Sequence, residues 1–450
     1  MAKVKSTKVD LAQNDAVLTL KNAITSSQKV CVIGMGYIGL PTASLLAAKG
    51  FQVCGVDTNF AIIKLVNQKK NHICEKGLQK FVEIAIDTGN LEPSLYPTSA
   101  DVFIVAVPTP FKAGKVPDLS YVEEAISNIV PYLQPGNLIV LESTSPVGTT
   151  EKVAKWIQEK RSDLTIPTYA LRGDNGHPIP DGESRIYIAY CPERVLPGRI
   201  IEELEMNDRI VGGVDYPSAV KAKNFYTKFV KGEVLITDCR TAELCKLAEN
   251  AYRDVNIAFA NELSLVCDQL GLNVWEVCSL ANRHPRVNIL KPGPGVGGHC
   301  IAVDPWFIID SAPEQTCLMQ AARKVNDSMP NHVASRVIEN VFRFNDPIIA
   351  CLGLSYKADT NDLRESPSLE ITTMLAARRK EKILVVEPNI EKLPDSLLEF
   401  NVELIDIKTA LQNAHIILVL TDHSEFKDID TSALRNKVII DTRGMWQSKQ

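Results

Sequence analysis

The sequence predicts an α/β fold in which two Rossmann-like, doubly wound domains are joined by a long central helix. Short β-branched runs alternate with helical patterns in both halves of the 450-residue chain, as is typical of parallel sheets covered by helices on both faces. Between the halves, a segment of about 30 residues has helical periodicity and no internal Gly or Pro. The chain length itself predicts about three domains.

The first half begins with a polar extension over residues 1–28. Strands are expected after it at 29–34, 52–57, 101–107, 137–143 and 185–190. A glycine-rich turn follows the first of these strands, and a helix is expected from Pro41 to Lys49. The segment 168–184 is rich in Gly, Pro and Asp, which predicts a surface loop.

The long helix is expected from Thr241 to about Leu270. At 1.5 Å per residue it would span about 45 Å, which suits a connector between domains or a subunit interface. A glycine-rich loop at 291–300 and a short helical segment to about Phe344 follow. Strands of the second α/β half are expected at 347–356, 382–388, 415–423 and 437–444.

Composition excludes several classes of function. The net charge of −5 gives no basic field for a nucleic-acid backbone. No apolar run approaches the roughly 20 residues of a membrane span, and the N-terminus has no secretory signal, so we expect a cytoplasmic protein. The 11 cysteines are odd in number and lack zinc-ligand spacing, so we expect reduced thiols and no metal site.

The hexapeptide from Gly34 to Gly39, with Gly36 between them, matches G-x-G-x-x-G between a strand and a helix. Such glycines allow the backbone to approach a pyrophosphate at the N-terminus of the helix. Asp57 ends the next strand, where its carboxylate would bind a ribose 2′-hydroxyl and repel a 2′-phosphate. The motif therefore favours NAD over NADP, and the alternative is a tight turn without a ligand.

Hydroxyl side chains follow the next two strands, at the sheet edge where ligands bind in open α/β folds. Thr109 lies after the first, and Thr144 and Thr150 lie after the second. We expect them to contact NAD or substrate. Capping of a helix N-terminus by one such hydroxyl is the alternative.

Cys300 follows a glycine loop that would let a substrate carbon approach closely. Cysteine both adds to an aldehyde and leaves from a thioester, and its thiolate needs an electropositive environment. Lys246, Asn250 and Arg253 lie at i, i+4 and i+7, so they share one face of the long helix. The alternatives are a structural cysteine and a solvated polar face.

Glu193 ends a strand and would be either a general base for water or a salt-bridge partner. The second α/β half has no G-x-G-x-x-G motif. Lys357 and Arg364 follow its first strand, and they predict a phosphate-binding site for a nucleotide-bearing substrate.

Together these motifs resemble the UDP-glucose/GDP-mannose dehydrogenase family. The resemblance runs in motif order from Lys29 to Trp446 and rests on the phrases VPTPFK, LESTSPVGTTEK, IAYCPERVLPG, CKLAEN, RDVNIAFANELSL, ANRHPRVNIL and PGPGVGGHCIAVDPWFI. The 168–184 segment is longer than is usual in the family.

The resemblance implies a role for each matching residue. Cys300 would be the nucleophile, Lys246 the acid/base, and Glu193 an aid to thioester hydrolysis. Asn250, Asp304 and Thr144 would complete the catalytic set. Contacts to NAD would come from Gly34, Gly36, Tyr37, Ile38, Gly39, Asp57, Thr109, Thr150 and Arg364. The substrate site would contain Arg194, Val195, Lys246, Asn250, Arg253, His284, Arg286, Gly297, Tyr356 and Lys357.

The implied activity is a four-electron oxidation of a UDP-sugar at C6 with NAD, in surface polysaccharide precursor synthesis. UDP-N-acetyl-D-mannosamine is the expected substrate, and UDP-N-acetyl-D-glucosamine or UDP-glucose is the alternative. A one-step hydroxyacid dehydrogenase and a non-catalytic binding protein are the rivals from other classes.

The implied domains are an NAD-binding domain at 29–236, a central helical region at 237–335 and a UDP-sugar-binding domain at 336–450. A homodimer or higher homo-oligomer is expected through the central helix.

Overall fold

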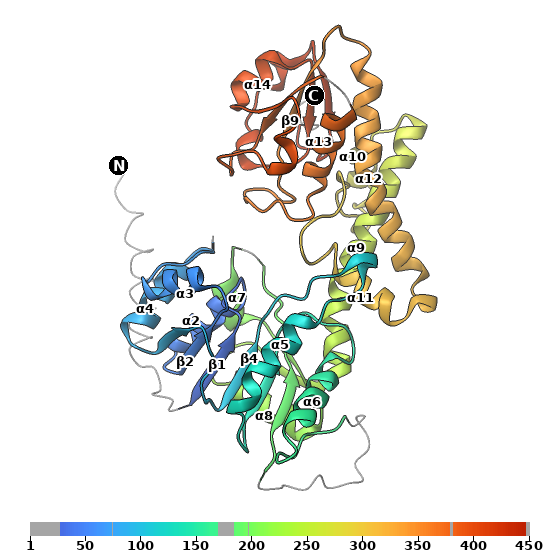
Figure 1. The fold of residues 1–450 in the computed structure, drawn as a ribbon. Helices are drawn as coiled ribbons and strands as arrows, with labels where there is room; N and C mark the ends of the chain where they lie inside the picture. Colours follow the sequence, from blue (N-terminus) through green and yellow to red (C-terminus); the bar gives the residue numbers. More distant parts are fainter. Residues whose placement is uncertain (1–27, 74, 170–183, 197, 379–380, 447–450) are drawn as a thin grey trace, which may run out of the picture. The chain divides into compact units, whose positions relative to one another are not determined.

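Figure 1 shows a computed structural model of the chain. The structure describes residues 28–73, 75–169, 184–196, 198–378 and 381–446. The chain divides into two compact units, with the boundary between Leu247 and Ala248. Most of the expected polar extension and of the 168–184 loop lies outside the described residues.

The first unit is built on an eight-stranded sheet with the order β3-β2-β1-β4-β5-β6-β7-β8. Its strands are β1 (Lys29–Ile33), β2 (Gln52–Val56), β3 (Leu91–Ser94), β4 (Val102–Val105), β5 (Leu138–Leu141), β6 (Tyr187–Tyr190), β7 (Arg209–Gly213) and β8 (Val234–Asp238). The strands β4 and β5 are buried along their whole length, which explains their uninterrupted apolar sequences.

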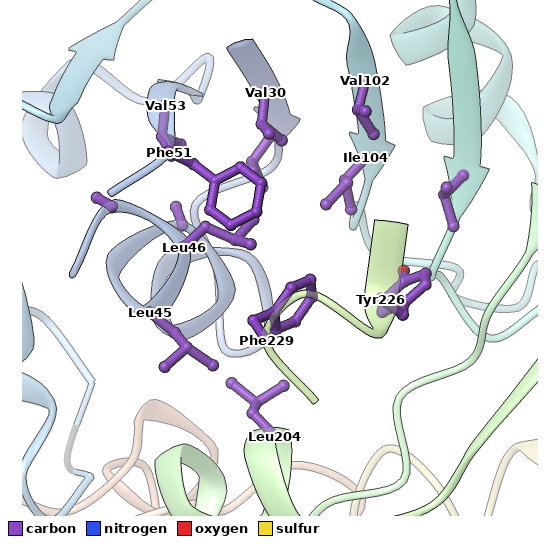
Figure 2. Packing of buried hydrophobic residues seen from close by; sticks show 14 of the residues in the cluster. Val30, Leu45, Leu46, Phe51, Val53, Val102, Ile104, Leu204, Tyr226 and Phe229 are labelled. Atoms are coloured by element: carbon purple, nitrogen blue, oxygen red, sulfur yellow. The ribbon is translucent and has the colours of Figure 1, made fainter. Parts of the chain in front are cut away.

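Helices cover both faces of this sheet. They are α2 (Gly39–Ala48), α3 (Phe60–Asn67), α4 (Leu78–Asp87), α5 (Ser120–Ile129), α6 (Thr149–Lys160), α7 (Ile200–Met206) and α8 (Tyr216–Tyr226). Alternate strand residues face opposite clusters: Val30 packs with Leu46 and Phe229 on one side (Figure 2), and Cys31 belongs to the cluster on the other. This two-sided packing confirms the predicted doubly wound architecture.

The sheet differs from the predicted parallel sheet at one pair, because β6 and β7 are antiparallel. The intervening helix α7 has only seven residues, and the chain re-enters the sheet beside the end of β6. A parallel pair would need a crossover that returns to the start of β6. The strands β3, β7 and β8 were not predicted.

The long central helix is confirmed as α9 (Cys239–Leu270), with 32 residues that cross the boundary between the units. The helix α10 (Val274–Ala281) follows it, and α11 (Asp304–Ser311) follows the glycine-rich loop. The segment expected to be short is instead α12 (Cys317–Val341), a helix of 25 residues that accommodates Pro330 in its interior.

The second unit contains a parallel sheet with the order β11-β10-β9-β12-β13. Its strands are β9 (Ile348–Leu352), β10 (Lys382–Val386), β11 (Val402–Leu404), β12 (Ile416–Val419) and β13 (Val438–Asp441), and its covering helices include α13 (Pro367–Arg378) and α14 (Ile407–Asn413). Among the described residues, no helix combines the length and apolar character needed to cross a bilayer.

Candidate active site

Three glycines shape the turn between β1 and α2, and the chain needs them for different reasons. Gly34 has a φ of +93°, and a Cβ atom there would lie 2.6 Å from the carbonyl oxygen of Ala106. A Cβ atom on Gly39 would lie 1.7 Å from the carbonyl oxygen of Gly34. At Gly36, however, a Cβ atom would meet nothing within 4 Å. Packing within the chain therefore does not require Gly36, and the open space above it fits a pyrophosphate.

Asp57 lies directly after β2 with its carboxylate over this turn. Its Oδ2 accepts the backbone N–H of Met35 at 2.9 Å, and its Oδ1 accepts that of Asn59 at 2.8 Å. A carboxylate has about four acceptor positions, so the half-buried Asp57 retains capacity for a ribose hydroxyl. Tyr37 and Ile38 are half-buried in the same turn. These residues fit NAD.

Two of the predicted threonines are brought together, and the third is engaged elsewhere. The Thr109 hydroxyl donates to the carbonyl oxygen of Thr144 at 2.5 Å, and both residues are half-buried. Thr150 is fully buried, and its hydroxyl donates to Glu243 Oε1 at 2.6 Å. Its hydroxyl proton is therefore committed to the protein.

Glu243 is a residue that sequence reasoning missed. Its side chain on α9 is fully buried, and its two oxygens accept the backbone N–H groups of Gly148 and Thr150. Burial raises its pKa to about 7, although these hydrogen bonds oppose the shift. Glu243 thus connects the first turns of α9 to the start of α6 by hydrogen bonds. The contact could not be predicted from the sequence because Glu243 and Thr150 are 93 residues apart.

Glu193 lies after β6 and is 7% exposed. Arg209 Nη1 donates to its Oε2 at 2.7 Å, and the backbone N–H of Arg194 donates to its Oε1 at 2.7 Å. The half-buried Arg194 and Val195 follow it in the chain. The structure thus shows the salt-bridge role, and the pair holds the carboxylate in one orientation.

In the second unit, the glycine loop before Cys300 is packed rather than free. A Cβ atom on Gly297 would lie 2.7 Å from the Tyr356 Cβ atom and 2.4 Å from the carbonyl oxygen of Glu365. Gly298 has a φ of +81°, and a Cβ atom there would lie 2.8 Å from the Tyr356 ring. The two glycines therefore let this loop press against the segment 356–367.

Two side chains of the segment 356–367 interact electrostatically with the half-buried Cys300. The carbonyl oxygen of Cys300 accepts the backbone N–H groups of Val303 at 3.0 Å and Asp304 at 2.8 Å, which fixes the turn into α11. Arg364 interacts electrostatically with Cys300, and hydrogen bonds from Arg364 to Asp362 raise the pKa of the arginine. The structure thus gives Cys300 a cationic neighbour, and the ion pair with Asp362 balances part of the charge of this arginine.

Tyr356 also interacts electrostatically with this cysteine. Burial raises the pKa of the Tyr356 hydroxyl, and the charges of Asp362 and Cys300 act in the same direction. Cys300, Tyr356 and Arg364 were assigned to three different roles by the sequence, and the structure brings them together in one unit.

Asn250 and Asp304 are also brought together. The Asn250 side-chain amide on α9 donates to Asp304 Oδ2 at 2.5 Å, and Asp304 is 3% exposed at the start of α11. Lys246 lies one helical turn before Asn250 on α9 and is half-buried, whereas Arg253 is exposed. The contact fixes α11, and with it the Cys300 turn, against the long helix.

A buried polar network that sequence reasoning missed supports the same loop. Arg323 Nη1 on α12 donates to Asp254 Oδ1 on α9 at 2.6 Å, and the Asn326 amide donates to the same oxygen. Asn261 donates to Asn326 Oδ1 at 2.9 Å and accepts the backbone N–H of Gly293 at 2.8 Å. The network thereby joins α9 and α12 to the loop that carries Cys300.

The remaining predicted residues lie on exposed segments of the second unit. His284 and Arg286 are exposed on the loop after α10, where the backbone N–H of Arg286 donates to His284 Nδ1 at 3.3 Å. Two hydrogen bonds between Asn282 and the backbone of Ile289 close this loop. Lys357 is exposed after β9.

Comparison with protein families matches the chain in three segments. The NAD-binding domain of the UDP-glucose/GDP-mannose dehydrogenase family matches residues 28–230, the central domain of that family matches residues 240–328, and its UDP-binding domain matches residues 350–448.

Individual relatives cover almost the whole chain. An NDP-N-acetyl-D-galactosaminuronic acid dehydrogenase of Ralstonia solanacearum is 52% identical over 94% of this chain and 97% of its own length. A UDP-N-acetyl-D-mannosamine dehydrogenase of Yersinia pestis is 48% identical over 94% of this chain and 100% of its own. The solved structure of a UDP-D-ManNAc dehydrogenase from Pyrococcus horikoshii has a TM-score of 0.81 at 37% identity and covers 93% of this chain and 96% of that one.

Proposed function

Because the chain belongs to the UDP-glucose/GDP-mannose dehydrogenase family, we propose that it oxidises UDP-N-acetyl-D-mannosamine at C6. The product would be UDP-N-acetyl-D-mannosaminuronate, a precursor for surface polysaccharide, made in the cytoplasm. The observation that carries the proposal is Cys300, which lies half-buried on a packed loop beside Arg364. A dehydrogenase that stops at an aldehyde or ketone has no need of such a nucleophile.

The first unit would hold NAD over Gly36, with contacts from Tyr37, Ile38, Asp57 and Thr109. NAD, when bound, accepts a hydride, so a four-electron oxidation needs two NAD molecules in succession. Thr150 would contribute through its acceptor lone pairs, because its hydroxyl proton is donated to Glu243.

Lys246 would take the proton of the C6 hydroxyl in the first oxidation. Cys300 Sγ would then add to the aldehyde carbon and form a thiohemiacetal, and the second oxidation converts this adduct to a thioester. Lys246 and Asn250 would donate to the oxygen that becomes negative during addition. Asp304 would hold Asn250 in place through the 2.5 Å hydrogen bond.

Hydrolysis of the thioester needs a water molecule and a base. Glu193 would accept a proton from this water, and Thr144 would help to hold it. Arg364 would support the thiolate that leaves, since it interacts electrostatically with Cys300. Residues that would bind the UDP-sugar are Arg194, Val195, Arg253, His284, Arg286, Gly297, Tyr356 and Lys357.

The relatives favour a 2-acetamido sugar, and they differ in which one their names give. The Yersinia pestis relative is named for N-acetyl-D-mannosamine, whereas the Ralstonia solanacearum relative is named for N-acetyl-D-galactosaminuronic acid. UDP-N-acetyl-D-galactosamine is therefore a second candidate substrate beside UDP-N-acetyl-D-glucosamine.

The substrate is tested by kcat/KM for UDP-N-acetyl-D-mannosamine and for the UDP derivatives of N-acetyl-D-glucosamine, N-acetyl-D-galactosamine and glucose. We expect the highest value with UDP-N-acetyl-D-mannosamine. A higher value with any of the other three would replace the assigned sugar and leave the reaction type intact.

We also propose that the enzyme is a homodimer built on α9. Exposed apolar side chains recur along one face of this helix, with Tyr252 70%, Phe259 56%, Val266 46% and Leu270 64% exposed. Their spacing of seven, seven and four residues places them in one stripe, which is typical of an unpartnered interface. Analytical ultracentrifugation tests this: we expect a dimer that Phe259→Glu dissociates, and a wild-type monomer would contradict it.

A further inference from the structure

A buried group of ionisable side chains lies at the carboxyl ends of β5 and β6. Glu142 follows β5 and is 3% exposed, Arg209 opens β7 and is 2% exposed, and Glu193 is 7% exposed. Tyr226 at the end of α8 and Cys191 before Glu193 are fully buried. The group therefore holds two carboxyls and one guanidinium, and Glu142 has no place in the mechanism described above.

The two carboxyls have unequal partners. Glu193 receives a charged donor from Arg209 and a backbone N–H from Arg194, each at 2.7 Å. Within the part of the chain that the structure describes, Glu142 Oε1 receives only the Tyr226 hydroxyl, at 2.6 Å. Among the described residues, Glu142 Oε2 is buried and has no hydrogen-bond partner.

Charge balance then decides where a proton lies. With both carboxyls ionised, the group would carry one uncompensated negative charge away from water, which is costly. With one proton the group is neutral, and an oxygen without a partner costs least on the neutral carboxyl. The proton therefore belongs on Glu142, while Arg209 pairs with the ionised Glu193.

The surroundings of Glu142 act in this direction. Burial and the charge of Glu193 together raise its pKa to about 7, although Arg209 and the Tyr226 hydroxyl oppose the shift. Burial likewise raises the pKa of the neighbouring Cys191 thiol to about 12, so this cysteine stays neutral. The Arg209 guanidinium lies 5.6 Å from the centre of the Tyr226 ring, so the same tyrosine contacts both Arg209 and Glu142.

We propose that Glu142 is a positioning residue that shares one buried proton with Glu193 across Arg209, and so sets how readily Glu193 accepts a proton from the hydrolytic water. When Glu142 is neutral, Arg209 is balanced by Glu193 alone. When Glu142 ionises, the group becomes negative, and Glu193 takes up a proton more readily. This inference rests on the proposed role of Glu193 in thioester hydrolysis.

The hydrolytic step balances without any redox partner. Water transfers one proton to Glu193, and its oxygen forms the new C–O bond to the thioester carbon. The C–S bond breaks, and its electron pair stays on Cys300 Sγ. In the ionised group, the proton that Glu193 gains balances the negative charge of Glu142, so the group is neutral after this step. Glu193 then releases the proton to solvent, which restores the starting charge.

The test compares Glu142→Gln, which resembles a permanently protonated glutamate, with wild type. Acid quench and intact-protein mass spectrometry measure the decay of the sugar adduct on Cys300 between pH 6 and 8.5. We expect wild-type decay to accelerate as pH rises through about 7. In Glu142→Gln that rise should be absent, so that decay at pH 8 is about tenfold slower and decay at pH 6 is unchanged.

Two further variants sharpen the comparison. Tyr226→Phe removes the hydrogen bond that favours ionised Glu142, so the rise should move to higher pH. Glu123→Gln makes the same chemical change at an exposed position on α5 and should reproduce the wild-type profile. The same pH profile in Glu142→Gln and wild type would overturn the inference.

Thermal melting tests the buried proton without any turnover. Since the folded protein holds this proton between about pH 4.5 and 7, wild type loses stability as pH rises through that window. Glu142→Gln should melt at the wild-type temperature at pH 5 and at a higher temperature at pH 8. Equal melting temperatures at both pH values would overturn the inference. If no adduct and no NADH formed, the proposed function would be contradicted. The melting temperatures would still show whether Glu142 holds a proton in the folded protein.

Discussion

The two units place an acidic residue at the same point of the same fold and use it in opposite ways. Asp57 follows the second strand of the first unit, is half-buried, and accepts two backbone N–H groups. Glu387 follows β10 of the second unit and has a side chain with no exposed surface. One acid is open to a ligand, and the other is enclosed by the protein.

The partners of Glu387 account for the difference. Its Oε2 accepts the backbone N–H groups of Leu354 at 2.8 Å and Ser355 at 3.1 Å, and it lies 3.0 Å from His423 Nε2. Its Oε1 accepts the backbone and side-chain N–H groups of Asn389. An acidic residue after the second strand of a Rossmann-like unit therefore does not by itself indicate a dinucleotide site. The number of protein donors around its carboxylate determines whether it can still bind a ligand.

The largest effect should come from removing the enclosed acid. Glu387→Ala leaves several buried donors without an acceptor, which costs about 3–5 kcal/mol of unfolding free energy. Asp57→Ala is the matched control, and we expect it to cost less, about 1–2 kcal/mol, because only two backbone N–H groups lose their acceptor. Denaturant unfolding measures both, and equal losses would contradict the distinction between the two acids.

Acid should weaken the second unit through the same residue. Burial would raise the pKa of Glu387, but hydrogen bonds from His423 and from the backbone of Leu354 and Ser355 outweigh it and lower the pKa to about 2, against 4.5 ordinarily. The contribution of Glu387 to the free energy of unfolding is therefore fully present above pH 4.5. About 3 kcal/mol of it is lost as pH falls from 4.5 to 2. The wild-type loss over this range should be smaller by about this amount in Glu387→Gln, because other carboxylates with a lowered pKa, such as Asp238 and Asp362, are unchanged. Unfolding measured at each pH tests this.

The open acid should affect cofactor binding instead. Asp57→Asn removes the charge that would favour a ribose hydroxyl, so the KM for NAD should rise about 10- to 100-fold, which corresponds to about 1.4–2.7 kcal/mol. The KM for the UDP-sugar should stay within twofold. An unchanged KM for NAD would mean that Asp57, like Glu387, serves only the protein.

The smallest change in stability is expected at Gly36. Gly36→Ala should alter the unfolding free energy by less than about 1 kcal/mol, because its Cβ atom meets nothing within 4 Å, yet it should weaken NAD binding. Gly39→Ala is the contrast, since its Cβ atom would lie 1.7 Å from the carbonyl oxygen of Gly34 and the turn could not close. Calorimetric titration with NAD and thermal melting separate the two effects.

The sequence predicted those elements whose signal is local. The strands β1, β4, β5, β9 and β12 are rich in buried β-branched residues, and each was expected. The strand β3 contains Pro93, and β11 has only three residues, none of them fully buried, so neither has a clear strand pattern. In β7, Gly212 and Gly213 weaken the pattern, yet they are required because the chain around Asp238 and Ala219 approaches closely.

The same limit applies to the candidate site. The G-x-G-x-x-G motif and the glycine loop before Cys300 are contiguous and were visible in the sequence. Glu243, Asn261 and Glu142 act through partners that lie 93, 65 and 84 residues away in the chain. Such contacts exist only after the sheet and α9 have formed, so no local sequence pattern predicts them.

The proposed four-electron oxidation is tested most directly by the number of NADH molecules formed per UDP-sugar consumed. Limiting UDP-N-acetyl-D-mannosamine would be incubated with excess NAD until the reaction is complete. We predict two NADH and one uronate per sugar, because the Cys300 thioester is the product of the second oxidation. One NADH per sugar, with an aldehyde or ketone as product, would contradict the proposal.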